Sequence, residues 1–164
     1  MEETYIMAKL ENLSSCSIGV YEPFWLQDIT AHSGDIFHST YSVDKLLTWS
    51  KPEVIGNFWL APDHMTGGGF ILNTSSTTIS KIQLVNTHNT IANDRGTKSF
   101  KIYVSLDLNS SWTLVLEEEL ADSRTVAPAP INKFNIQPVS ARYVKFELVS
   151  FWGLGGGLQY FNII

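Results

Sequence analysis

The residues best suited to chemistry lie close together in the segment from Asn86 to Lys98. The segment offers an imidazole, carboxamides and one adjacent pair of opposite charges, carried by His88, Asn89, Asn93, Asp94 and Arg95. Such groups can donate and accept the hydrogen bonds that a ligand with vicinal hydroxyls needs. None of them is a nucleophile activated by a neighbouring base. The segment therefore predicts binding rather than catalysis.

Two further segments carry groups that fit such a site. Pro62, Asp63 and His64 precede three consecutive glycines, which is typical of a loop. Trp152 follows Phe151, and an exposed indole can stack on the apolar C–H face of a sugar ring. Trp59 and Trp112 are instead expected in the core.

Other chemistries find little support. The histidines at positions 32, 38, 64 and 88 match no compact metal-ligand spacing. The glycines at 155–157 lack the Lys-Ser or Lys-Thr pair of a phosphate-binding loop, so they are expected to serve turn geometry. Ser, His and Asp residues are too common for their order along the chain to indicate a catalytic triad. We therefore expect no enzyme and no metal.

The polar segment also has structural interpretations, which the sequence leaves open. Asp94 and Arg95 could bind a ligand, or they could form a clamp that holds the loop in shape. His88 and Asn89 begin the loop, where they could contact a ligand or bond to the nearby backbone.

The segments that position these residues are predicted to be strands. Short segments rich in Ile, Val, Phe, Tyr and Thr recur between turn-forming residues, and helical periodicity is nearly absent. One helical turn is expected over Ser42–Thr48, with Ser42 as its cap. The expected strands are 27–33, 70–73, 79–85, 100–105, 112–116, 131–136, 141–149 and 158–164. About eight main strands without crossover helices favour an antiparallel sandwich.

Composition limits the organisation and the partners. The chain has 164 residues, of which 44% are hydrophobic and 16% charged, enough for one core. The net charge of −5, with scattered basic residues, disfavours nucleic acid or an anionic membrane as partner. The single Cys16 excludes an internal disulfide. We expect an N-terminal arm over 1–26 and one domain over 27–164.

The order of motifs resembles the coagulation factor 5/8 type C, or discoidin, family of galactose-binding-like jelly rolls. The motifs are the polar loop with Asp94-Arg95-Gly96, the strand Phe100–Ser105 followed by Trp112, Ala141-Arg-Tyr-Val-Lys-Phe146, and the glycine-rich segment that ends in Phe161. The resemblance covers about Gln27 to Ile164. It implies an all-β jelly-roll sandwich whose loops at one end bind sugars, phospholipid heads or proteins without chemistry.

The resemblance also implies where a ligand would bind. Positions from three loops that converge in sugar-binding relatives fall here on Asp63, His64, His88, Asn89, Asn93, Asp94, Arg95, Phe151 and Trp152. Many relatives hold a structural calcium with an Asp-Gly pair and a Glu of the last strand. This chain has Thr48-Trp49 and Gln159 there, so we expect no cofactor.

The leading hypothesis is a noncatalytic, lectin-like module that binds carbohydrate or glycoprotein, as in cell adhesion. Its site residues would be His64, His88, Asn89, Asn93, Asp94, Arg95 and Trp152. The alternative is a protein-interaction or assembly module of the same fold, in which the N-terminal arm contacts a partner protein. The resemblance points to an extracellular location, although the Met-Glu-Glu start is not a secretory signal.

Overall fold

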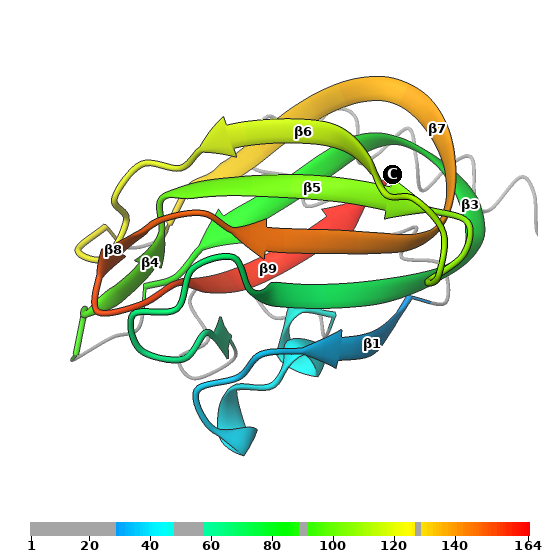
Figure 1. The fold of residues 1–164 in the computed structure, drawn as a ribbon. Helices are drawn as coiled ribbons and strands as arrows, with labels where there is room; N and C mark the ends of the chain where they lie inside the picture. The colour runs from blue at the N-terminus through cyan, green and yellow to red at the C-terminus, as the bar shows by residue number, and fades with distance from the viewer. Residues whose placement is uncertain (1–28, 48–57, 89–91, 127–128) are drawn as a thin grey trace, which may run out of the picture.

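The computed structural model describes residues 29–47, 58–88, 92–126 and 129–164, which form nine strands and two short 3₁₀ helices (Figure 1). The elements are β1 (Thr30–Gly34), η1 (Ser39–Tyr41), η2 (Val43–Leu46), β2 (Trp59–Leu60), β3 (Gly69–Asn86), β4 (Arg95–Thr97), β5 (Ser99–Ser105), β6 (Thr113–Glu119), β7 (Ile131–Leu148), β8 (Phe151–Gly153) and β9 (Gly157–Ile163). The predicted N-terminal arm and Cys16 lie outside the described residues.

Two long strands, β3 and β7, build the sandwich because each bends and contributes to both layers (Figure 1). The first half of β3 pairs with β1 and with the second half of β7, which continues to β5 and β6. The second half of β3 pairs with the first half of β7 and with β9, which continues to β2. All these pairings are antiparallel, and the architecture confirms the predicted jelly-roll sandwich.

The bend in β3 explains one difference from the sequence-based expectation. The sequence predicts separate strands over 70–73 and 79–85, but one strand runs through both, with a register shift between Asn73 and Thr77. Ser75 and Ser76 have left-handed backbone angles, with φ of 56° and 64°. The Asn73 side chain accepts a hydrogen bond of 2.9 Å from the backbone N–H of Ser75. A local polar turn therefore bends the strand without ending it.

Stacked aromatic rings fill the core between the layers. Phe70, Phe146 and Phe100 stack with ring centroids 4.9 and 5.5 Å apart, and Trp59 meets the first two edge-on. Trp59 is fully buried, which confirms its predicted core position. The prediction for Trp112 is wrong, because this side chain is only half-buried, with the Lys145 ammonium 5.2 Å from its ring centroid.

The short elements differ in detail from the expectation. The helical turn after Ser42 is the 3₁₀ helix η2, and Leu46 is buried as expected, but Ser42 makes no side-chain capping bond. Strands β4 and β8 have three residues each and form a separate two-stranded sheet that the sequence did not predict. Among the described residues, no helix is long and apolar enough to cross a membrane.

Candidate functional site

The two-stranded sheet β4–β8 lies at one end of the sandwich, on the left in Figure 1, where three loops of the chain meet. Hydrogen bonds tie these loops together. The N–H of Gly96 donates to Gly155 O over 3.0 Å, that of Leu154 to Asp94 O over 2.7 Å, and that of His64 to Leu154 O over 2.8 Å. The backbone thus brings the segments around His64, Asp94 and Leu154 to one place.

Strand alternation divides the side chains of this sheet between two faces. In the β4–β8 register, Arg95 lies opposite Gly153, Gly96 opposite Trp152, and Thr97 opposite Phe151. Directly paired residues share a face and successive residues alternate. Arg95 and Trp152 therefore project from opposite faces, which we name the Arg95 face and the Trp152 face.

Arg95 is the centre of the Arg95 face, and its side chain is only 5% exposed. Its Nη1 donates to the backbone carbonyl of Ala61 over 3.1 Å, and its Nη2 donates to the Asp63 carboxylate. Its Nε lies 3.8 Å from a carboxylate oxygen of Asp94. The guanidinium carbon is also 3.9 Å from the centroid of the Phe37 ring. Through these contacts the buried guanidinium fixes the loop around Asp63, whereas the clamp interpretation of Asp94 and Arg95 concerns the central loop.

Exposed groups surround this buried arginine. The Asp63 side chain is 48% exposed although Arg95 holds it, and Phe37 is 45% exposed. His64 is exposed, has a left-handed φ of 58°, and its ring centroid lies 6.3 Å from that of Phe151. The Arg95 face thus presents a fixed carboxylate, an imidazole and aromatic carbon to solvent. This combination suits a ligand with hydroxyls on one side and C–H groups on the other.

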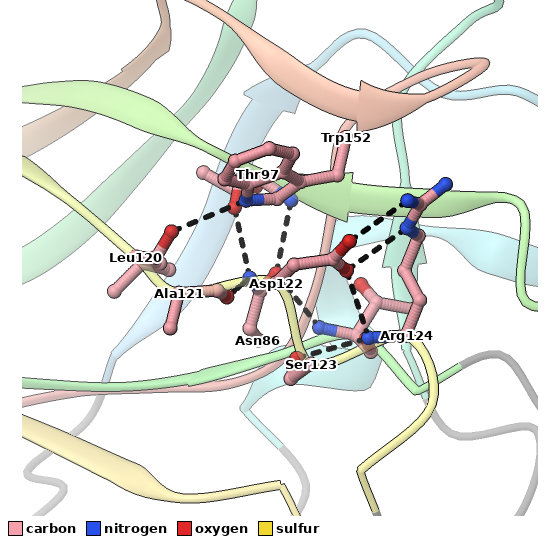
Figure 2. A network of polar contacts seen from close by, with 9 residues as sticks. Asn86, Thr97, Leu120, Ala121, Asp122, Ser123, Arg124 and Trp152 are labelled. Carbon is pink, nitrogen blue, oxygen red and sulfur yellow. Dashed lines mark hydrogen bonds and ion pairs between the residues drawn. The ribbon is translucent and has the colours of Figure 1, made fainter.

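The Trp152 face is built over a buried asparagine (Figure 2). The side-chain Nδ2 of Asn86 donates to the carbonyls of Thr97 and Ala121 over 2.8 and 3.0 Å. Its Oδ1 accepts from the N–H groups of Thr87 and Thr97, both over 2.9 Å. One carboxamide therefore joins the end of β3, strand β4 and the loop after β6.

Trp152 takes part in the same network. Its indole N–H donates to Leu120 O over 3.2 Å (Figure 2). The Lys98 ammonium lies 4.8 Å from its ring centroid. The indole is half-buried, with its polar atom bonded and a cation over the ring. It therefore helps to hold the loop at Leu120 in place.

An ion pair lies beside this network on the same loop. Arg124 donates from Nε and Nη2 to both oxygens of Asp122, over 2.9 and 2.8 Å (Figure 2). The hydrogen bonds from Arg124 lower the pKa of the Asp122 carboxyl, and Asp122 raises the pKa of Arg124. The arginine stem approaches Gly96 and its Nη1 approaches Gly153, where added side chains would crowd it.

The other predicted site residues begin or end the central loop. His88 is half-buried just after Asn86 and Thr87, and Asn89 lies outside the described residues. Asn93 has a left-handed φ of 44°, and its buried Oδ1 has no hydrogen-bond partner among the described residues. The structure thus brings His64, Asp94 and Arg95 together and separates them from Trp152.

Phe37 belongs to the candidate site, although the sequence alone does not mark it. It lies about 60 residues before Arg95 in an irregular segment, where no periodicity or turn motif marks it. The N–H of Phe37 donates to Leu60 O over 2.8 Å, which carries the ring to Arg95. Within the described ranges, no group of three or more His, Cys, Asp or Glu could hold a metal ion.

A family model described as the F5/8 type C domain matches residues 73–159. No curated protein sequence matches the chain significantly.

Several solved structures share the fold. A module from a family 31 glycoside hydrolase of Clostridium perfringens, CBM32-1, has a TM-score of 0.67 and 18% identity, covering 84% of this chain and 94% of its own. The family 32 carbohydrate-binding module of C. perfringens NanJ, solved with galactose, has a TM-score of 0.64 and 14% identity, covering 82% and 92%. Chitosan-binding module 1 from a chitosanase/glucanase of Paenibacillus sp. IK-5 has a TM-score of 0.62 and 17% identity, covering 87% and 97%.

Proposed function

Because the chain belongs to the F5/8 type C domain family, we propose that it is a noncatalytic module that binds carbohydrate on the Arg95 face. The observation that carries this proposal is the exposed Asp63 carboxylate, held by buried Arg95 beside the exposed Phe37 ring. Modules of this fold have been solved with galactose and with chitotriose, which supports a sugar as ligand.

Each group has a defined part in this proposal. Asp63 accepts hydrogen bonds from sugar hydroxyls, and its orientation is set in advance by Arg95, so little side-chain entropy is lost on binding. Phe37 stacks on the C–H face of the ring, and His64 bonds to a further hydroxyl. The sugar contacts of His88, Asn89, Asn93 and Asp94 remain predictions. Trp152 supports the neighbouring loop.

The affinity should be modest, because an exposed site exchanges hydrogen bonds to water for hydrogen bonds to protein. We expect a dissociation constant of about 0.1–1 mM for one sugar unit. Useful avidity would then come from several modules or from tethering to another domain.

The test is calorimetric titration with galactose, a GalNAc-β-1,3-galactose disaccharide and chitotriose. Phe37→Ala and Asp63→Asn should each weaken binding of the best sugar by about fivefold to tenfold. Leu106→Ala and Glu118→Gln are matched controls, because both residues are exposed away from the site, and they should bind as the wild type does. A folded wild-type protein that binds none of these sugars, nor any glycan of an array, would leave the assembly module as the better hypothesis.

A further inference from the structure

A groove of about 320 Å³ opens between the end of β1, the start of β3 and strand β7, and it shares no lining residue with the Arg95 face. Its volume lies within the range of small-ligand sites. Two cross-strand rows form it. Ser33, Ile71 and Lys145 are paired in one row. In the other, Gly69 lies between Asp35, with which it exchanges hydrogen bonds, and its β7 partner Glu147.

The walls of the groove carry two carboxylates, Asp35 and Glu147, that no described cation pairs with directly. Lys145 also lines the groove, but its ammonium lies 4.3 Å from the ring centroid of Tyr103, on β5. Lys101 faces Glu147 from β5, but it pairs with Glu117 at 3.4 Å. Both nearby ammonium groups therefore have a partner on β5 or β6, and Glu147 adds only a weaker electrostatic attraction to Lys101.

The floor of the groove is uncharged and has little side-chain bulk. Gly67, Gly68 and Gly69 line it together with the half-buried Ile71. A Cβ on Gly68 would lie 2.6 Å from both the Asp35 carboxylate and the Met65 sulfur, so a residue without a side chain is needed at this crowded position. Glycine backbone and the Ile71 side chain thus lie between the two carboxylates, and Ser33 also lines the groove.

We propose that this groove is a second carbohydrate site, selective for an amino sugar whose free amine is protonated. The inference rests on the proposed function and extends it to a further surface and ligand class. An ammonium group complements Asp35 and Glu147, hydroxyls can bond to Ser33 and the carboxylates, and the ring can lie over the glycines and Ile71.

The experiment compares a β-1,4-linked glucosamine tetramer with its fully N-acetylated counterpart by titration calorimetry, at a pH where the free amine is protonated. The glucosamine tetramer should bind about fivefold more tightly, and this preference should disappear in high salt because the charges are partly exposed. Glu147→Gln and Asp35→Asn should each weaken the glucosamine tetramer by about threefold to fivefold and leave the N-acetylated tetramer unchanged. Asn at position 35 retains the acceptor for the Gly69 N–H.

The outcomes separate the two sites. Glu118→Gln controls for loss of an exposed carboxylate, and Asp63→Asn should leave the amine preference intact. Equal binding of the two tetramers, or no effect of either groove variant, would overturn the second site while Asp63-dependent binding still supports the first. Equally tight, Glu147-dependent binding of a lysine-rich peptide would assign the groove to a basic peptide and overturn the amino-sugar assignment. Absence of any sugar binding would overturn both proposals.

Discussion

Asn86→Ala should be among the most destabilising substitutions in the chain. The Asn86 side chain is buried and makes four hydrogen bonds, to Thr97 N–H and carbonyl, Thr87 N–H and Ala121 carbonyl. A neutral hydrogen bond contributes about 0.5–1.5 kcal/mol net, and a buried group left without a partner costs about 1–3 kcal/mol. Some of the freed backbone groups can relax toward water, so we expect a loss of about 3–4 kcal/mol.

Urea unfolding followed by tryptophan fluorescence measures this loss. It is a large share of the 5–15 kcal/mol that stabilises a typical domain, and the melting temperature should fall by about 10 °C. Asn109→Ala is the matched control, because Asn109 is exposed in the β5–β6 turn. It should change the free energy of unfolding by less than about 0.5 kcal/mol.

Asn86→Asp gives an independent check of the same geometry. It keeps the acceptor but turns a second oxygen toward the carbonyls of Thr97 and Ala121. Burial without a cation raises the pKa of such a carboxyl, so the variant should be less unstable at low pH, where its proton can be donated. A loss below about 1 kcal/mol in Asn86→Ala would refute the view that this carboxamide joins the loops.

Three other predictions concern Gly69 in β3, Arg95 in β4 and the ion pair of Asp122 with Arg124. Gly69→Ala should lower the melting temperature by several degrees, because the new Cβ would lie 2.0 Å from the Phe146 carbonyl oxygen. Gly67→Ala is the comparison, because its Cβ would meet nothing within 4 Å and any loss of stability there comes from the positive φ alone. Arg95→Met should reduce sugar affinity about as much as Asp63→Asn, because Asp63 loses its orienting partner; unchanged binding in titration calorimetry would contradict that role. Because Arg124 lowers the pKa of Asp122, their contact stabilises the fold above the pKa of an unperturbed Asp, and this stabilisation is lost as the pH falls through the pKa of Asp122 in the folded protein. In urea titrations from pH 7 to pH 3, the free energy of unfolding should depend less on pH in Asp122→Asn than in the wild type. An identical dependence would refute the pairing.

The sequence predicts the strands well because each buries one face. Phe100, Ile102 and Val104 alternate with more exposed residues, and this alternation can be recognised without knowing which strands pair with β5. Whether two apolar segments form one strand depends on the bend between them. The Ser-Thr segment after Asn73 reads as a loop in isolation, yet β3 runs through it because β7 follows the same curve.

The candidate site was only partly predictable. The polar loop identified Asp94 and Arg95, but sequence position does not tell which face of a three-residue strand a side chain occupies. That depends on the β4–β8 register, which places Trp152 opposite Gly96. Phe37 reaches Arg95 through a backbone hydrogen bond to Leu60, a long-range contact without a local signal.

The most direct test of sugar binding on the Arg95 face is an NMR titration of the ¹⁵N-labelled protein with the best sugar of the calorimetric panel. We expect saturable shifts of the Arg95 side-chain Nε–H and of the Phe37, Asp63 and His64 amides, while the Trp152 indole N–H signal does not shift. Shifts confined to Trp152 and its neighbours, or an unchanged spectrum of the folded protein at saturating sugar, would contradict sugar binding on the Arg95 face.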